Sequence, residues 1–285
     1  MPDLTHQIHR PDRVTTCVIF ASPHSGRDYP RGFLRQSQLD RKIIRSSEDA
    51  WVDRLFGTAP EHGAPLLVET APRAYVDLNR SAEELDPAVV EGARKPGHNP
   101  RVASGLGVIP RVVAGGRPIY RGKISMIEAQ RRLNQVWYPY HDTLWGLMRD
   151  AQAQFGRSIL IDCHSMPREA LEGAARGRKR PDIVLGDRFG ASAGLEIVDA
   201  IESVFASEGF EVARNTPFAG AYVTQTYGRP SRHQHAIQVE IDRSLYMNEA
   251  TLQPLDGFDA LRARLGRVMS KIADLGRASG RLAAE

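Results

Sequence analysis

Residues 157–167 read RSILIDCHSMP, and this stretch decides the fold class. Its first part, 158–163 (SILIDC), is almost entirely apolar. A short apolar run of this kind is typical of a strand that is buried on both faces, as in the centre of an α/β sheet. His164 follows the run directly. Because ligands of open α/β sheets bind outside the carboxyl ends of the strands, we expect a polar site at this point.

Strand and helix candidates alternate along the rest of the chain. Further strands are predicted at 14–20 (VTTCVIF), 66–70, 75–78, 183–185 and 236–241 (AIQVEI). Helices are predicted at about 48–60, 126–153, 190–207 and 254–276. This alternation, without a repeat or a linker, favours a single α/β domain over 1–285, with helices on both faces of a mixed sheet.

The segment from about residue 86 to residue 123 differs from the rest of the chain. It is rich in glycine, proline and arginine and has no clear periodicity. Long segments of this kind are usually functional lids or disordered. Apolar and aromatic anchors are spread through it at Val108, Ile109, Ile119 and Tyr120, so we predict a lid.

Composition and charge are those of an ordinary globular protein, with 41% hydrophobic and 25% charged residues. The two cysteines, Cys17 and Cys163, lie in or beside apolar runs, which indicates buried thiols in a reducing compartment. The N-terminal residues lack the apolar stretch of a secretory signal, and no run approaches the ~20 residues of a membrane span. A cytoplasmic location without a membrane partner is expected.

The basic balance does not by itself indicate nucleic-acid binding. The net charge is only +4, and the densest basic run, RGRKR at 176–180, is interpreted as a solvated loop. Arginine pockets that hold carboxylate substrates would also raise the isoelectric point. We therefore expect a small-molecule substrate and no nucleic acid, while the sequence leaves the oligomeric state open.

Two histidines follow strand candidates in similar contexts. His24 comes after 14–20 in FASPHSG, and His164 comes after 158–163 in LIDCHSMP. A single histidine after a strand is more often an ordinary loop residue than a ligand. Two in matching positions at the edge of one sheet favour a metal site, because imidazole is the commonest metal ligand.

The third ligand is sought among acidic residues, because a hydrolytic zinc site usually has three protein ligands and one position for water. The stretch SEDAWVD at 47–53 offers Glu48 and Asp49 at the start of a predicted helix. Acidic residues there can also simply stabilise the first helical turn. Asp49 is the preferred ligand and Glu48 is the alternative.

Glu240 is the candidate general base. It lies in the apolar run AIQVEI, where a carboxylate is costly to bury unless it is paired or functional. An ion pair with Arg243 is the structural alternative. Asp242 is the rival base, because it lies two residues further on and shares the same face of a strand.

The stretch RAYVDLNR at 73–80 is the fourth cluster, and its alternation resembles a strand that ends in Asn79 and Arg80. An arginine can bind a carboxylate through two parallel hydrogen bonds, which suits recognition of an amino-acid substrate. The alternative is a surface Arg80 that pairs with Asp77 or a nearby glutamate. The sequence contains no phosphate-binding loop of the Gly-x-x-x-x-Gly-Lys type and no His-Glu-x-x-His motif.

Seven stretches, in order, resemble the successive motifs of the N-formylglutamate amidohydrolase family. They span about residues 17–247 and read SPHSGRDYP, EDAWVDRLF, RAYVDLNR, GLGVIPR, IDCHSMP, PFAGAYVTQTYGRP and HAIQVEIDRSLYM. The resemblance implies a three-layer α/β/α sandwich with a mixed central sheet, similar to zinc carboxypeptidases and aminoacylases. It also implies a Zn²⁺ ion in each chain and hydrolysis of an N-formyl or other N-acyl amino acid. In histidine degradation the substrate is N-formyl-L-glutamate, which yields formate and L-glutamate.

Carried over to the matching positions, the resemblance implies a role for each cluster. His24, Asp49 (or Glu48) and His164 would bind the metal, and Glu240 would be the base. The chain departs from the carboxypeptidase pattern, in which the acidic ligand follows the first histidine by three residues. Here that position is Arg27, which cannot be the ligand.

Substrate contacts are implied as well. Asn79 and Arg80 would hold the α-carboxylate. One arginine would bind the side-chain carboxylate or stabilise the oxyanion, and the candidates are Arg73, Arg111 and Arg121. The segment PFAGAYVTQTYG is either an ordinary loop or a pocket wall whose polar contacts are Tyr222 and Thr224.

Two rival functions remain open at this level. The first is a zinc hydrolase of the same fold that acts on another N-acyl amino acid or a short peptide. The second is a non-catalytic protein that binds anions or nucleic acid through the basic lid. The second would bind no metal, and its affinity for nucleic acid would depend on salt.

Overall fold

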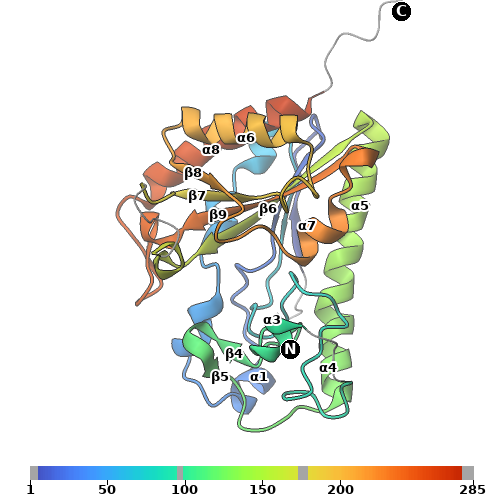
Figure 1. The fold of residues 1–285 in the computed structure, drawn as a ribbon, viewed down its shortest axis with the longest axis vertical. Coiled ribbons are helices and arrows are strands. Elements are labelled where there is room, and N and C mark those ends of the chain that lie inside the picture. Colours follow the sequence, from blue (N-terminus) through green and yellow to red (C-terminus); the bar gives the residue numbers. More distant parts are fainter. Residues whose placement is uncertain (1–5, 95–98, 173–178, 278–285) are drawn as a thin grey trace, which may run out of the picture. The chain divides into compact units, whose positions relative to one another are not determined.

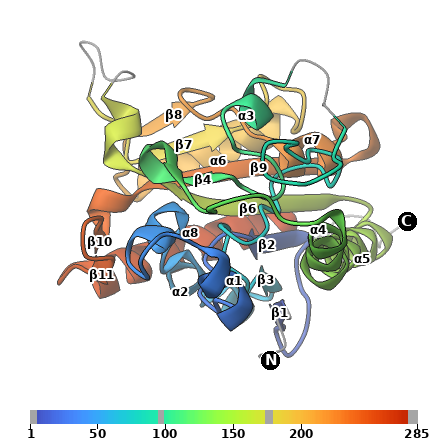
Figure 2. The same ribbon diagram turned by 90° about the horizontal axis from the view of Figure 1, so that it is seen from below.

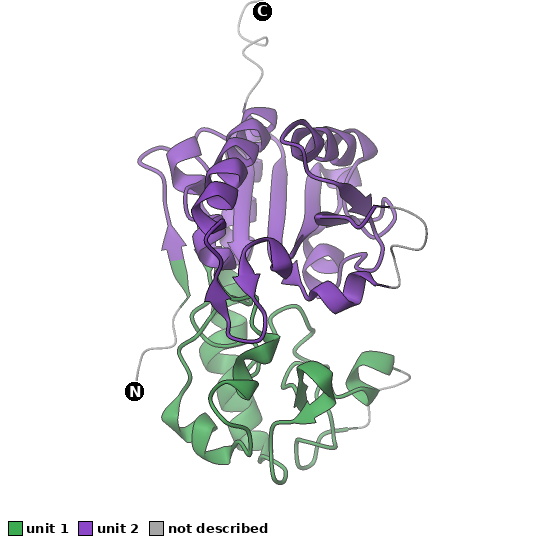
Figure 3. Cartoon of the chain, turned by 90° about the vertical axis from the view of Figure 1, so that its left-hand side faces the viewer, with its two compact units in different colours: residues 1–7, 23–50, 68–143 green, residues 8–22, 51–67, 144–285 purple. Residues whose placement is uncertain are grey.

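The structure is a computed structural model that describes residues 6–94, 99–172 and 179–277. The chain divides into two compact units, which Figure 3 distinguishes by colour. Unit 1 comprises residues 1–7, 23–50 and 68–143, and unit 2 comprises residues 8–22, 51–67 and 144–285. Unit 2 holds most of a large β-sheet, whereas unit 1 consists mainly of short helices, turns and a small two-stranded sheet.

The main sheet has seven strands in the order β1-β3-β2-β6-β9-β7-β8, which Figure 2 shows from β1 at the bottom to β8 at the top. The strands are β1 (Gln7–His9), β2 (Val18–Ser22), β3 (Leu66–Val68), β6 (Ser158–Met166), β7 (Ile183–Gly186), β8 (Val212–Arg214) and β9 (Gln234–Asp242). β2, β6 and β9 are parallel, whereas β7 is antiparallel to β9. The sheet is therefore mixed.

Helices cover both faces of this sheet in unit 2 (Figure 1). α6 (Leu195–Ser207) and α8 (Phe258–Gly276) pack against one face, while α7 (Tyr222–Tyr227) and the later part of α5 (Tyr138–Phe155) lie on the other. The buried residues of α8 recur at helical spacing and form one apolar stripe, as expected for a helix that packs on a sheet. They are Leu261, Leu265, Val268, Met269, Ile272, Ala273 and Gly276. The predicted α/β fold with a mixed central sheet is confirmed.

The remaining elements are short. The helices are α1 (Arg31–Gln36), α2 (Val52–Leu55), α3 (Pro100–Ala103) and α4 (Met126–Arg132), and a π-helix (Leu133–Trp137) joins α4 to α5. The 3-10 helices are Ile43–Ser47, Ala59–His62, Ala114–Gly116, Arg168–Leu171, Pro230–Arg232 and Arg243–Leu245. Two small antiparallel pairs are formed by β4 (Val112–Val113) with β5 (Arg117–Pro118) and by β10 (Met247–Asn248) with β11 (Gln253–Pro254).

The segment predicted as a lid lies in unit 1 and contains α3, β4 and β5. Its four expected anchors, Val108, Ile109, Ile119 and Tyr120, are all buried. Tyr120 belongs to an aromatic cluster around the buried Arg132, to whose Nη1 its hydroxyl is bonded at 2.7 Å. The segment is thus anchored by its apolar residues, and its action as a lid remains a prediction.

Three local predictions differ from the structure. The predicted strand 75–78 is wrong, because the backbone there forms a turn closed by hydrogen bonds from Tyr75 and Val76 to Pro72 O. The predicted helix 48–60 is shortened to α2 and a 3-10 turn. The strand 158–163 extends to Met166, so His164 lies inside the strand and not after it.

Some sequence predictions concern features that the structure describes only in part. Of the basic run 176–180, residues 176–178 lie outside the described residues, and Lys179 is exposed and pairs with Glu211. Cys17 and Cys163 are buried free thiols. Among the described helices, none is both long and apolar enough to cross a membrane.

Candidate metal centre

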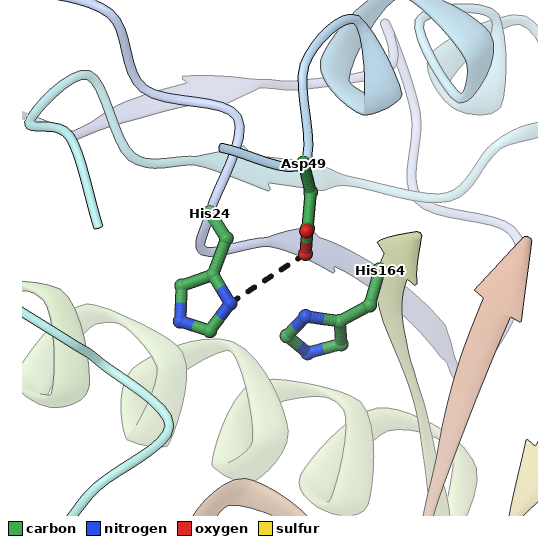
Figure 4. Close-up of side chains that lie close together, drawn as sticks. All are labelled: His24, Asp49 and His164. Carbon is green, nitrogen blue, oxygen red and sulfur yellow. Dashed lines mark ion pairs between the residues drawn. The ribbon is translucent and has the colours of Figure 1, made fainter. Parts of the chain in front are cut away.

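Three buried side chains lie together as a possible metal site (Figure 4). His24 comes two residues after β2, Asp49 precedes α2, and His164 lies near the end of β6. Each offers one ligand atom, and these atoms all lie within 4.8 Å of one another. Figure 4 shows both imidazole rings presenting a nitrogen toward the Asp49 carboxylate. The structure therefore brings together the three predicted ligands.

His24 is held from both sides of its ring. Its Nδ1 lies 3.6 Å from Asp49 Oδ2, and its Nε2 lies 2.9 Å from Asp77 Oδ1. A carboxylate beside Nε2 keeps the ring proton on that nitrogen, so that Nδ1 offers a lone pair toward Asp49. The backbone N–H of Asp49 also donates to His24 O at 2.9 Å, which fixes the two residues relative to each other.

Asp77 is a site residue that sequence reasoning assigned no role of its own. Burial raises the pKa of its carboxyl, but the charges of Arg73 and Arg80 and the hydrogen bond from His24 outweigh burial and hold the pKa well below its usual value. Arg73 Nε donates to Asp77 Oδ2 at 3.1 Å, so one carboxylate bridges Arg73 and His24. The sequence does contain a signal for Asp77. An aspartate inside the apolar run AYVDL is as costly to bury as Glu240 inside the run AIQVEI.

His164 has a carboxylate neighbour on its own strand. Residues two apart on a strand face the same side, and Asp162 Oδ2 lies 2.9 Å from His164 Nε2. The two groups are close enough to form an ion pair, although they are not aligned for a hydrogen bond. Each of the two histidines thus has an aspartate beside Nε2, and at His24 this contact is a hydrogen bond of the kind that orients metal-binding imidazoles in proteins.

The choice between Glu48 and Asp49 follows from the neighbours of Glu48. Its Oε1 accepts hydrogen bonds from Tyr29 Oη at 2.7 Å and from Arg45 Nε at 2.9 Å. Arg45 Nη2 donates to the second carboxylate oxygen at 2.9 Å. Both oxygens of Glu48 therefore hold the preceding turn together, whereas Asp49 lies with the histidines, and Asp49 is the candidate ligand.

These residues fit a divalent metal ion by the chemistry of their donor atoms. Two imidazole nitrogens and one carboxylate oxygen form the ligand set of many hydrolytic zinc sites, in which a fourth position is left for water or substrate. The three side chains are almost completely buried, and their shielding from water strengthens the attraction between the carboxylate and a cation. A metal ion could therefore be held by His24, Asp49 and His164.

Glu240 is placed by the pairing of the two central strands. β6 and β9 are parallel, and His164 is the register partner of Glu240. The side chain is buried, and Gln238 Nε2 donates to its Oε1 at 2.8 Å. The rival base, Asp242, accepts a hydrogen bond from Ser244 N and caps the turn that follows β9. Asp242 thus has a local structural role, and Glu240 remains the candidate base.

Asn79 and Arg80 lie in the irregular segment that follows Asp77. Arg80 is buried, and burial lowers the pKa of its guanidinium. Its Nε donates to Leu106 O at 2.9 Å, and its Nη1 donates to Asn79 O at 2.7 Å. The surface position considered for Arg80 is wrong, because Arg80 is buried, although the negative charge of Asp77 does act on it. The buried guanidinium is held in one orientation by backbone carbonyls.

The remaining predicted contacts have diverse surroundings. Arg111 pairs with Asp86 at 2.9 Å, and Arg121 is exposed. Tyr222 is half-buried at the first turn of α7, where the hydroxyl of Thr224 donates to Ala221 O at 3.1 Å. The segment PFAGAYVTQTYG is therefore partly a short helix rather than a loop throughout. The roles of Arg121, Tyr222 and Thr224 in substrate binding remain predictions.

Arg243 and Tyr246 were not predicted as site residues. Both are buried, and they bond the serine that follows His164: Arg243 Nε donates to Ser165 Oγ at 3.2 Å, and the Tyr246 hydroxyl lies 2.9 Å from it. The turn after β9 is thereby connected to the end of β6. No pattern in the sequence singles out these two residues, because an arginine and a tyrosine after a strand are common at protein surfaces.

The chain is similar in sequence to known proteins. The family model of N-formylglutamate amidohydrolase matches residues 16–247. The chain is 32% identical over 234 residues to the N-formylglutamate deformylase of Pseudomonas aeruginosa, covering 80% of this chain and 82% of that protein. It is 29% identical over 235 residues to the deformylase of Pseudomonas putida, covering 81% and 82%.

The chain is also similar to solved structures. The N-formylglutamate amidohydrolase of Ralstonia eutropha superposes with a TM-score of 0.89 at 34% identity, covering 96% of this chain and 98% of that one. A gene product of Agrobacterium tumefaciens shares the fold, with a TM-score of 0.64 at 17% identity and 95% coverage of both chains. From the match over residues 16–247, the chain belongs to the N-formylglutamate amidohydrolase family.

Proposed function

We propose that the protein is a metal-dependent hydrolase that cleaves the amide bond of an N-formyl or related N-acyl amino acid. N-formyl-L-glutamate is the first candidate substrate, and its products would be formate and L-glutamate. The observation that carries the proposal is the buried group of His24, Asp49 and His164 in a chain of this family. The names of the similar deformylases support the choice of the formyl group.

A divalent ion such as Zn²⁺, when bound to these residues, supplies a Lewis acid that polarises a carbonyl group and acidifies water. Glu240 takes a proton from the attacking water, and the water oxygen forms a bond to the formyl carbon. As the bond from that carbon to nitrogen breaks, Glu240 returns the proton to the leaving amine. The hydrogen bond from Gln238 holds the Glu240 carboxylate in place for both transfers.

Substrate orientation is assigned to the buried segment that carries Asn79 and Arg80. Arg80 binds the α-carboxylate through charge-assisted hydrogen bonds, and Asn79 completes this contact. Arg73 is the candidate for stabilising the oxyanion, because its Nε is held by Asp77, the same carboxylate that holds His24.

The test is formate release from a panel of N-formyl and N-acetyl amino acids. The proposal expects the highest kcat/KM on an N-formyl amino acid with an acidic side chain, and activity that disappears on chelation and returns with Zn²⁺. Formate release that is unaffected by chelation would contradict the metal-dependent mechanism. Hydrolysis of N-acetyl substrates alone would contradict the choice of acyl group.

Glu240→Gln tests the base. It should lower kcat by at least about a hundredfold, since general base catalysis is typically worth 10²–10⁴, and it should leave the metal content unchanged. Asp242→Asn is the matched control, because it changes a buried carboxylate on the same strand that caps a turn. Near-normal turnover in Glu240→Gln, or an equal loss in both variants, would remove Glu240 from this role.

A further inference from the structure

We propose that Trp137 and His141 are positioning residues for the segment 77–80, which carries Asp77, Asn79 and Arg80. The inference rests on the proposed function, in which Asn79 and Arg80 bind the substrate α-carboxylate. All of these residues belong to unit 1. Trp137 and His141 bond the backbone of the segment, so their effect on the reaction would pass through Asn79 and Arg80.

The segment 77–80 is buried but has no regular secondary structure. Buried backbone carbonyls must nevertheless find hydrogen-bond donors, because leaving one unsatisfied is costly. In a strand the neighbouring strand would supply them. Here side chains do so, because His141 Nε2 lies 3.0 Å from Leu78 O and Trp137 Nε1 donates to Arg80 O at 2.9 Å. Arg80 itself donates to the carbonyl between them, Asn79 O.

The two donors form a pair on one helical stretch. They are four residues apart, so they lie on the same side of it, and their rings are in contact with centroids 4.1 Å apart. Trp137 is the last residue of the π-helix that separates α4 from α5. A π-turn contains one residue more than an α-turn and therefore rotates the residues after it by roughly 100° about the helix axis. The insertion thus sets which side of the helix Trp137 and His141 occupy.

His141 can act as a donor at any assay pH. Burial lowers its pKa to about 3, so the ring is neutral and carries one proton. The carbonyl of Leu78 accepts only, so the hydrogen bond at Nε2 places that proton on Nε2. Trp137 needs no such condition, because the indole nitrogen is always a donor. Both donors are therefore present permanently.

The consequence is preorganisation of the carboxylate-binding residues. Without the indole N–H, Arg80 O would be buried without this donor, and the segment would relax to find another. Asn79 and Arg80 would then have to be reordered by each substrate that binds. Such a change weakens the binding of substrates with an α-carboxylate, whereas an uncharged α-amide analogue loses little, because it gains little from Arg80.

Trp137→Phe tests the proposal by two readouts, with Tyr138→Phe as the matched control on the same helix. Tyr138 is partly exposed, and its replacement also removes one polar group from an aromatic ring. In Trp137→Phe we expect about a tenfold higher KM for N-formylglutamate, the effect of losing one buried hydrogen bond, with kcat within about twofold of the wild type. The KM of the α-amide analogue should not change.

Hydrogen exchange of the peptide that covers 76–81 gives the second readout, which does not depend on activity. Exchange at the Asn79 amide, which donates to Asp77 Oδ1 at 2.9 Å, should be faster in Trp137→Phe and unchanged in Tyr138→Phe. If Trp137→Phe does not fold, variants of His141 test the same proposal. His141→Gln retains an N–H donor, so its KM and its exchange rate should lie between those of His141→Phe and the wild type.

The two proposals fail differently. If the wild type hydrolyses none of the N-formyl or N-acetyl amino acids, the proposed function is wrong, and the exchange data still decide whether the two residues order the segment. If the wild type is active but Trp137→Phe matches Tyr138→Phe in exchange or in KM, the positioning role is overturned. An equal rise in KM for the acid and the amide would also overturn it.

Discussion

At the scale of single residues, the candidate site contains three aspartates in two kinds of position. Asp49 lies with the histidines, whereas Asp77 and Asp162 lie beside the Nε2 atoms of His24 and His164. The sequence allowed Asp49 to be chosen only narrowly over Glu48, because two adjacent acids before a helix look alike. The structure separates them through Tyr29 and Arg45, which no spacing rule connects to Glu48.

Asp77→Asn should weaken metal binding without unfolding the protein. The amide would keep the shape of the side chain but remove the charge that orients His24, and losses of 10–100-fold in metal affinity are typical of such changes. A competition titration against a chelator measures the affinity. Asp86→Asn is the control, because Asp86 is also a buried carboxylate paired with an arginine. Equal affinities in the two variants would contradict the role of Asp77.

Glu69 should make the stability of the protein fall as the pH rises. Burial raises its pKa to about 7, so between about pH 4.5 and 7 the folded protein holds a proton that the unfolded chain releases. Ionisation of the buried carboxyl therefore lowers the free energy of unfolding. For a pKa raised from 4.5 to about 7, the loss is on the order of 3 kcal/mol. Glu69→Gln should keep the acceptor for Thr70 N and Ala71 N but remove this dependence.

The measurement is the free energy of unfolding from denaturant titrations at pH 5 and pH 8. Glu69→Gln should gain stability relative to the wild type at pH 8 and little at pH 5. Glu83→Gln, at an exposed position, serves as the control and should follow the wild type. A Glu69→Gln protein whose stability relative to the wild type is the same at pH 5 and pH 8, or a parallel change in both variants, would contradict the assignment to Glu69.

At the scale of elements, the strands with long apolar runs could be predicted, and the irregular segments could not. Residues 158–163 and 236–241 became the cores of β6 and β9, because a nearly continuous apolar run indicates a strand buried on both faces. The run at 75–78 (YVDL) was predicted as a strand from its alternation, yet it is a buried turn. Its partners are side chains and turns far away in the sequence, such as Val108 O, which accepts from Asp77 N.

Gly26 should be intolerant of any side chain, because the loop after His24 packs directly on backbone. A Cβ there would lie 2.1 Å from Ala71 O, so Gly26→Ala must displace either this loop or residues 70–71. We expect a loss of stability of about 2 kcal/mol or more and a lower metal content, since His24 is two residues away. Thermal unfolding and metal analysis measure both effects.

Gly122→Ala is the matched control for Gly26→Ala. Nothing lies within 4 Å of a Cβ at this exposed position, so the variant should behave as the wild type does. A stable, metal-loaded Gly26→Ala protein would contradict the close packing of this loop.

At the scale of the whole molecule, the α/β class was predictable because strand and helix patterns are local in sequence. The order of the strands and the antiparallel direction of β7 were not, since they depend on pairings between distant segments. The site was predictable in part for the same reason. Two histidines in similar contexts could be recognised from the sequence. Their proximity to Asp49 depends on the fold, which brings together residues about 140 positions apart.

The central claim is that His24, Asp49 and His164 hold a metal ion on which amide hydrolysis depends. The most direct measurement is the metal content of purified wild type and His164→Ala, determined by elemental mass spectrometry together with formate release. We predict about one Zn²⁺ per wild-type chain and loss of both metal and activity in His164→Ala, because two ligands are too few to retain the ion. A His164→Ala protein that retains one tightly bound zinc ion, or a metal-free wild type with full activity, would contradict the account.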